Sequence, residues 1–188
     1  MNTFDALTLR RSIRKFRPES VSLDCLRQIV EVARLYPSGG NRQPIRFALI
    51  TDKELRDAVF VDLGWAMYLP DFKIAEDERP MAYIALLRDE EIAKNCDYDV
   101  GAASTVVMVA AVDKGLATCA LASFSKPKLS ALLNLPENLR PELLIAIGYP
   151  AHESSVVSMG DTIRYTQDEK GDFLVPKWSR EEVTAFEG

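Results

Sequence analysis

A basic run near the start of the chain is the first feature whose residue types could do chemistry. The segment Arg10–Arg14 places three guanidinium groups and one hydroxyl within five residues. Planar guanidinium forks suit bidentate binding of a phosphate group. Taken alone, such a run is more typical of a solvated surface. Ile13 and Phe16, which alternate with the charged residues, favour a phosphate-binding site over a solvated surface. If these two apolar side chains are buried, they fix the directions in which the charged side chains point.

The segment Pro37–Pro44 is the second such feature, and it reads Pro-Ser-Gly-Gly-Asn-Arg-Gln-Pro. Its glycines and prolines predict a loop. Glycine permits close approach of the backbone to a ligand, and Ser38, Asn41 and Gln43 offer hydroxyl and amide groups to a planar polar ligand. A simple connector between a helix and a strand explains the same composition equally well.

Several other kinds of site are absent from the sequence. No G-x-G-x-x-G or G-x-x-x-x-G-K-[ST] pattern occurs, so neither a Rossmann-type dinucleotide site nor a P-loop is predicted. The only histidine, His152, stands in a polar segment, where a solvated loop histidine is the favoured interpretation. The cysteines Cys25, Cys96 and Cys119 lack metal-ligand spacing, so no metal site is predicted.

Length and charge limit the function classes further. The chain has 188 residues and a net charge of −5, which predicts one domain, residues 1–188, and argues against a nucleic-acid-binding protein. The apolar stretch Val100–Val112 is too short to span a bilayer, so no membrane partner is expected. The odd number of cysteines and the lack of an apolar leader after Met1 predict a cytoplasmic protein.

Apolar periodicity predicts the elements that must position these residues. Helices are expected over 5–10, 22–36, 52–61, 99–114 and 125–133, with a last short helix after Ser179. Buried strands are expected over 47–51, 81–87, 116–121 and 142–149, and a hairpin-like turn over 168–172. Residues 62–80 show no periodicity. This alternation of helices and strands by itself suggests an α/β layered fold with a parallel sheet.

Five stretches, taken in their order and spacing, resemble the signatures of the FMN-dependent nitroreductase family. They are Arg10–Phe16, Pro37–Phe47, Asp99–Ala103, Gly115–Cys119 and Ile147–Pro150. The agreement extends over nearly the whole chain, and the combination is specific although no single stretch is.

The resemblance implies a different fold from the one suggested by pattern alone. It implies an α+β three-layer sandwich with a largely antiparallel central sheet flanked by helices. It also implies a homodimer with one FMN at each of two sites in the subunit interface. The apolar residues after Tyr149 are numerous enough to cover a partner, although a core within one chain would use them as well.

The resemblance also assigns cofactor-binding roles residue by residue. Arg10 and Ser12, with Arg11 adjacent, match the positions that bind the FMN phosphate, and Lys177 matches a late basic residue that completes this site. Arg14 matches the basic residue near the N1–O2 edge of the flavin. As the cation that stabilises negative charge there, Arg14 is the expected catalytic residue.

Two further segments are expected to touch the flavin ring. Ala122 and Ser123 match the positions whose backbone N–H groups face flavin N5 and O4. The loop Pro37–Pro44 is expected to reach the flavin ring from the other subunit. The loop residues implied to contact the ring are Pro37, Ser38, Gly39, Asn41 and Gln43.

The implied activity is electron transfer from NADH or NADPH through FMN to a small oxidised acceptor, such as a nitroaromatic or a quinone, by a ping-pong mechanism. A flavin-binding module without turnover and a flavin-modifying or dehalogenating relative are the alternatives. Trp65 and Tyr68, set between Gly64 and Pro70, are expected to form a flap that contacts the acceptor. An ordinary core position on a short helix is an equally weighted alternative for both residues.

Overall fold

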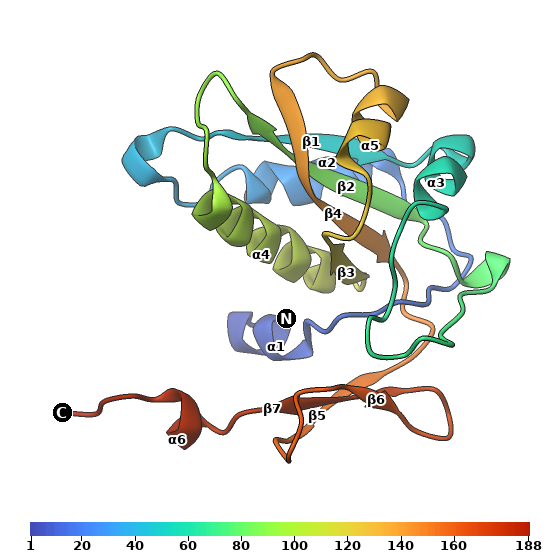
Figure 1. Cartoon of the computed structure of the whole chain (residues 1–188), viewed down its shortest axis with the longest axis vertical. Helices are drawn as coiled ribbons and strands as arrows, with labels where there is room; N and C mark the ends of the chain where they lie inside the picture. Colours follow the sequence, from blue (N-terminus) through green and yellow to red (C-terminus); the bar gives the residue numbers. More distant parts are fainter.

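A four-stranded sheet separates two apolar layers in the computed structural model, which describes residues 1–188 (Figure 1). Its strands are β1 (Ile45–Ile50), β2 (Ala82–Asp89), β3 (Ala117–Leu121) and β4 (Leu139–Gly148). They lie in the order β1-β2-β4-β3, and every neighbouring pair is antiparallel. The expected α+β sandwich is therefore confirmed, and the parallel sheet suggested by pattern alone is wrong.

One face of the sheet is covered by α2 (Leu23–Ala33) and α4 (Asp97–Asp113), with α1 (Thr3–Leu9) beside α4. The Ser22 hydroxyl accepts a hydrogen bond from the Cys25 N–H, which caps α2 where the sequence predicted its start. The small residues of α4 let it lie close to the sheet, and Val107 is fully buried there. This helix begins two residues earlier than expected.

The other face is covered by α3 (Lys53–Phe60) and α5 (Lys126–Leu132), which Asp52 and Ser125 cap as N-cap residues. Their apolar sides pack on the sheet together with Phe16. Between α3 and β2 the chain contains only a 3-10 turn, η2 (Glu76–Glu78), so the predicted irregular segment is confirmed. No helix of the chain combines the length and the apolar character needed to cross a membrane.

The segment 12–17 extends the sheet beyond β3. Ser12 forms a parallel bridge with Thr118, and the Ile13 N–H donates to the Thr118 carbonyl at 2.9 Å. Phe16 is fully buried against Gly148, where a Cβ atom would lie 2.9 Å from the Phe16 ring. Only glycine allows this close approach. The basic run is thus held along the edge of the sheet.

The last part of the chain forms a small second sheet. Its strands are β5 (Ser154–Ser158), β6 (Thr166–Gln167) and β7 (Phe173–Lys177), in the order β5-β7-β6. The β6–β7 turn confirms the predicted hairpin, whereas β5 was not expected. A capping box between Ser179 and Glu182 starts α6 (Arg180–Val183), which projects beyond the body of the molecule (Figure 1). In the rest of the article we call residues 150–177 the tail.

Candidate functional site

Three arginines of the basic run have no carboxylate partner. In the same run, Lys15 pairs with Glu78 at 3.0 Å and Arg17 pairs with Glu19 at 3.2 Å. No carboxylate lies within 4.0 Å of the guanidinium groups of the other three, which are Arg10, Arg11 and Arg14. Such a concentration of unpaired positive charge attracts an anion.

The Arg14 guanidinium lies over two neighbouring rings of the tail. Its central carbon lies 4.6 Å from the centre of the Tyr165 ring and 4.5 Å from that of Phe173. Cation–π contacts of this kind are worth about 0.5–2 kcal/mol each, depending on how far they are desolvated. The guanidinium also donates to the Ser12 carbonyl at 3.4 Å. Arg14 is therefore fixed in direction by residues far away in the sequence.

His152 supports the same segment from the other side. Its Nε2 accepts the backbone N–H of Arg14 at 2.9 Å, so Nδ1 carries the proton and donates to the Glu153 carbonyl at 2.8 Å. Its ring lies 4.9 Å from the Phe173 ring. The interpretation of His152 as a solvated loop residue is wrong, because the tail folds back and covers the ring.

The His152 contacts predict a pH-dependent stability. Burial lowers the pKa of His152, and the Arg14 charge adds to this effect while Asp172 opposes it. A pKa below that of the unfolded chain, about 6.5, means that the folded state binds fewer protons there. The contribution of neutral His152 to the stability of the fold is complete above pH 6.5 and decreases as the pH falls below that value.

The variant His152→Gln keeps a hydrogen-bond acceptor but cannot be protonated. Its loss of Tm between pH 7 and pH 5.5 should be smaller than the loss in the parent. Equal losses would contradict the assignment.

Arg11 lines an open cavity at the end of α1. This cavity of about 520 Å³ lies between the ends of α1 and α4 and the tail, and Arg11 lines it with Ile13 and His152. The Nε atom of Arg11 is buried and has no hydrogen-bond partner. Burial and the charge of Arg10 lower the pKa of Arg11. An anion bound here would satisfy the unpaired group.

Ala122 and Ser123 follow β3 directly, the strand with which Ser12 and Ile13 pair at Thr118. Both residues are exposed, and neither backbone N–H donates a hydrogen bond within the chain. The Ser123 carbonyl accepts the Gly64 N–H at 2.9 Å, which fixes the segment. Two free N–H donors on a fixed turn suit the acceptor atoms of a ligand.

The loop Pro37–Pro44 has a strained backbone. Gly40, Asn41 and Gln43 have positive φ angles of 60°, 54° and 51°, and the last two pay a steric cost that glycine avoids. Their conformation is held by Gln43, whose N–H donates to the Ser38 hydroxyl at 3.0 Å and whose side chain donates to Asn41 at 2.9 Å. Strain of this kind is frequent at ligand-binding sites.

The structure does not bring this loop to the basic run within one chain. Gly39 and Gly40 line a shallow cavity with Asn95 and Asp99, at the start of α4. In Figure 1 the loop is the light-blue turn beside β1, at the opposite side of the molecule from the segment that follows α1. Pro37, like Asn41 and Gln43, is exposed.

The remaining predicted residues lie in three separate places. Tyr68 lies against the cluster around Arg14, with its ring 5.0 Å from that of Tyr165. Trp65 is half-buried 6.0 Å from the Phe60 ring, away from Arg14, and packs with the core under α3. Lys177 is exposed at the far end of β7, about 13 Å along the strand from Phe173.

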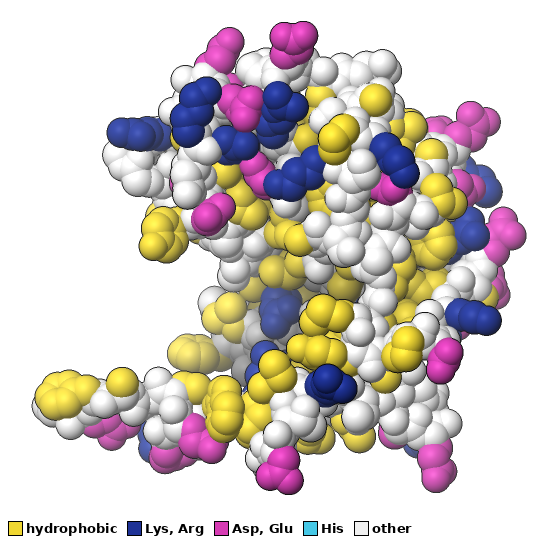
Figure 2. Space-filling model, in the orientation of Figure 1, with side chains coloured by type: hydrophobic (Ala, Val, Ile, Leu, Met, Phe, Trp, Pro, Cys, Tyr) yellow, Lys and Arg dark blue, Asp and Glu magenta, His cyan; other side chains and the backbone are white.

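Figure 2 shows a hollow between the body of the molecule and the last part of the chain, which projects at the lower left, with Lys or Arg atoms at the back of the hollow. The residues that sequence reasoning missed as part of the site are Tyr165, Phe173 and His152, which all belong to the tail. Only the density of aromatic and apolar residues after Tyr149 pointed to this part of the chain. The site that the structure assembles within one chain is cationic, rigid and faced by aromatic rings.

Comparison with known proteins places this geometry in a family. The model of the nitroreductase family matches residues 7–73 and 78–149. A protein of Archaeoglobus fulgidus, provisionally named as an NADH dehydrogenase/NAD(P)H nitroreductase, is 27% identical over 161 residues, covering 81% of this chain and 87% of its own length. An iodotyrosine deiodinase of Thermotoga neapolitana is 26% identical over 163 residues, covering 78% and 88% of the two chains.

Solved structures agree on the fold. An FMN-dependent nitroreductase of Clostridium difficile superposes with a TM-score of 0.64 at 24% identity, over 84% of this chain and 92% of that one. An iodotyrosine deiodinase bound to FMN and 3-iodo-L-tyrosine superposes with a TM-score of 0.67 at 20% identity, over 86% and 97%. The matched range begins within α1, ends at Tyr149 just after β4, and contains the unpaired arginines of the basic run. This chain belongs to the nitroreductase family.

Proposed function

We propose that this chain is an FMN-dependent oxidoreductase that uses NADH or NADPH to reduce a small oxidised acceptor, such as a nitroaromatic or a quinone. The observations that carry the proposal are the unpaired guanidinium groups of the basic run, which pairs with β3 at Thr118, and the free N–H groups of Ala122 and Ser123 just after the same strand. An anionic group joined to a flat heterocycle with acceptor atoms would satisfy both. FMN has this chemistry.

Each part of the site then has a role in binding. Arg10, Arg11 and Ser12 would hold the phosphate, and the buried unpaired Nε of Arg11 is the atom most in need of such a partner. The N–H groups of Ala122 and Ser123 would hold the acceptor edge of the ring. Lys177, at the far end of β7 from Phe173, would complete the phosphate site.

The proposed mechanism depends on one fixed cation. Bound FMN would supply the redox chemistry, which is hydride and electron transfer, and the residues of this chain would bind and orient it. Arg14 would stabilise the negative charge that develops on the pyrimidine edge of the ring. Tyr165 and Phe173 keep its guanidinium in place before the charge appears, which lowers the cost of reorganisation. One pocket would serve donor and acceptor in turn, as a ping-pong scheme requires.

The active form is proposed to be a homodimer. The loop Pro37–Pro44 and the basic run lie apart within one chain, so only a second copy could bring such a loop to this site. A surface for that copy exists: α1, α2 and α4 line a groove of about 680 Å³. Leu7 and Val32 line it as exposed hydrophobic residues, and α1 and the end of α2 expose three more, Phe4, Leu9 and Leu35. The cytoplasmic location expected from the cysteines stays a prediction.

Anaerobic absorption spectroscopy tests the proposed function. The purified protein should be yellow, or become yellow with added FMN, and should bleach on addition of NADH or NADPH. The colour should then return with a quinone or a nitroaromatic. Colour without bleaching would support a flavin-binding module, and a chain that stays colourless with FMN would contradict both functions.

A dehalogenating activity is the second candidate, because proteins named iodotyrosine deiodinase match most of the chain. The same bleached protein should then release halide from a halogenated tyrosine. We favour the first candidate because the segment between α3 and β2 holds only the short η2 turn and no helical lid. Halide release faster than quinone reduction would reverse this preference.

Arg10→Ala should weaken FMN binding by about 1.5–3 kcal/mol, because one charge-assisted hydrogen bond to the phosphate is lost. Titration of the flavin-free protein with FMN measures the effect. Riboflavin, which lacks the phosphate, should bind the parent and the variant with similar affinity. An unchanged FMN affinity would contradict the phosphate role of Arg10.

Tyr68→Ala should change kcat/KM differently for different acceptors. The Tyr68 ring borders the Arg14 cluster from the irregular segment after α3, so it can contact an acceptor without holding the sheet together. Steady-state kinetics with a quinone and a nitroaromatic, together with Tm, give the measurement. A large fall in Tm with equal loss for both acceptors would identify Tyr68 as a structural residue.

A further inference from the structure

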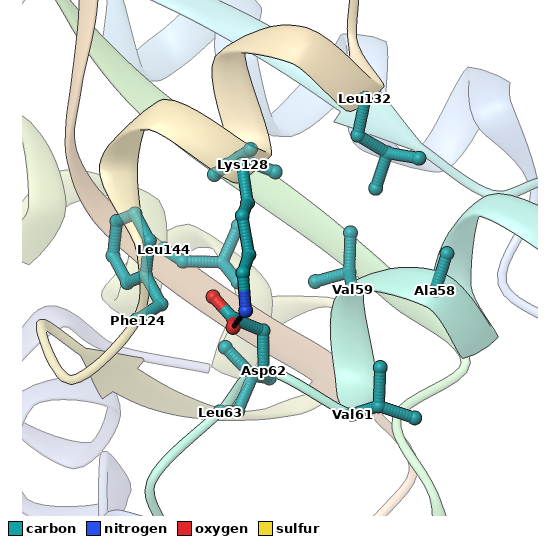
Figure 3. A pocket seen from close by; sticks show the side chains of 10 residues that line it. Ala58, Val59, Val61, Asp62, Leu63, Phe124, Lys128, Leu132 and Leu144 are labelled. Carbon is teal, nitrogen blue, oxygen red and sulfur yellow. Dashed lines mark hydrogen bonds and ion pairs between the residues drawn. The ribbon is translucent and has the colours of Figure 1, made fainter.

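A second, smaller cavity lies on the face of the sheet opposite α2 and α4. It has a volume of about 220 Å³, lies between α3, α5 and β4, and is partly open to solvent (Figure 3). Eight of its ten lining residues are hydrophobic. Figure 3 shows the side chains of Val59, Leu132, Leu144 and Phe124 arranged around one space, in front of the sheet. None of the residues assigned to the flavin lines it.

The polar groups at its rim are already paired. Lys128 Nζ lies 2.8 Å from one carboxylate oxygen of Asp62, and the other oxygen accepts the Ser125 N–H at 2.6 Å. The hydrogen bond from Lys128 is the main reason why the pKa of Asp62 is lowered. This bridge joins the end of α3 to the start of α5. The cavity thus offers no free hydrogen-bonding side chain, and a charged ligand would have to break the bridge.

The size of the cavity limits its occupant. An engineered protein cavity of about 150 Å³ with a similar aliphatic and aromatic lining binds benzene. The cavity here has room for one ring with small substituents, and the Phe124 ring can pack against another aromatic ring. We propose that it is a second ligand site, which binds a small uncharged aromatic molecule about one substituted benzene ring in size.

The cavity is in contact with the turn assigned to the flavin. Leu63 and Phe124 line it, and their chain neighbours Gly64 and Ser123 touch each other on the outer side. The contact is so close that a Cβ atom on Gly64 would lie 2.4 Å from the Ser123 hydroxyl. A ligand that displaces Phe124 or Leu63 therefore displaces Ser123. This coupling, unlike the binding site itself, rests on the proposed function.

Thermal unfolding of the purified full chain, freed of flavin, tests the site with toluene as the probe. Toluene should raise Tm by about 3–6 °C when its free concentration is ten times its Kd. Leu132→Phe fills the cavity and should abolish the rise, whereas Leu133→Phe, the same change one residue later at a half-buried position outside the lining, should keep it. A rise that is equal in both variants would overturn the proposal, as would its absence in the parent. Benzoate, the charged analogue, should cause no rise.

Methyl NMR of the parent keeps the test decisive if Leu132→Phe fails to fold. Toluene should shift the methyl signals of Val59, Leu129 and Leu144, and leave those of Leu26 on the opposite face unchanged. Shifts confined to the opposite face would overturn the site. If toluene binds but leaves the absorption spectrum of bound FMN unchanged, the coupling is overturned and the site stands. If FMN itself does not bind, the proposed function fails while the toluene results keep their meaning.

Discussion

Arg14→Gln is expected to lower kcat/KM for the acceptor by about 10²–10³-fold, the usual effect of removing one preorganised group that stabilises developing charge. The midpoint potential of bound FMN should fall at the same time, by about 30–60 mV, because the reduced ring loses its neighbouring cation. Steady-state kinetics and anaerobic redox titration measure the two effects. Glutamine keeps hydrogen-bonding capacity, so the change isolates the charge.

A matched control lies three residues further along the chain. Arg17 is also paired with an aromatic ring, at 5.4 Å from the Tyr149 ring centre, but its partner carboxylate Glu19 neutralises it. Arg17→Gln should leave both the rate and the potential near those of the parent. An Arg14→Gln enzyme with unchanged potential, or an Arg17→Gln enzyme with an equal loss, would refute the assignment of the catalytic cation.

Arg14→Lys refines the same test. Lysine restores the charge but not the planar group that packs over Tyr165 and Phe173. A recovered potential with an incomplete recovery of rate would indicate that the two rings act by holding the cation in position. Tyr165→Leu, which keeps apolar bulk beside Arg14, should then resemble Arg14→Lys.

The local elements were predictable because their signals are local. Ser22, Asp52 and Ser125 cap the helices they precede, and Gly115 ends α4 with a φ of 73°. These features depend on residues within one or two turns. Strand direction does not: antiparallel pairing of β2 with β4 joins residues about 60 positions apart, and only the family resemblance supplied it.

The site was only partly predictable for the same reason. The residue types of the basic run indicated an anion site, but nothing near Arg14 specifies that Tyr165 and Phe173 enclose it. His152 illustrates the error most clearly. Its neighbours in the sequence are polar, yet the backbone pairing of Ala151 with Lys15 buries its ring against Phe173. Burial of a loop residue is decided by the segment that folds onto it.

The loop Pro37–Pro44 and the basic run lie apart within one chain. Variants of these two segments are therefore expected to have a second large effect on activity. If each site is built from two chains, the double variant Arg10→Ala/Arg14→Gln and the double variant Asn41→Gly/Gln43→Gly should each be nearly inactive as homodimers. Glycine is chosen for the loop because positions 41 and 43 have positive φ angles, so the amide groups are removed without added backbone strain.

Mixing the two variants should restore activity that neither has alone. In a twofold dimer, a mixed pair has one site that carries both defects and one site that carries neither. With random exchange of subunits half of the dimers are mixed, so about a quarter of the parental activity should return. Native mass spectrometry verifies that mixed dimers have formed. Mixed dimers without recovered activity, or a monomer that still binds FMN tightly in analytical ultracentrifugation, would mean that the arginines and the loop do not meet across an interface.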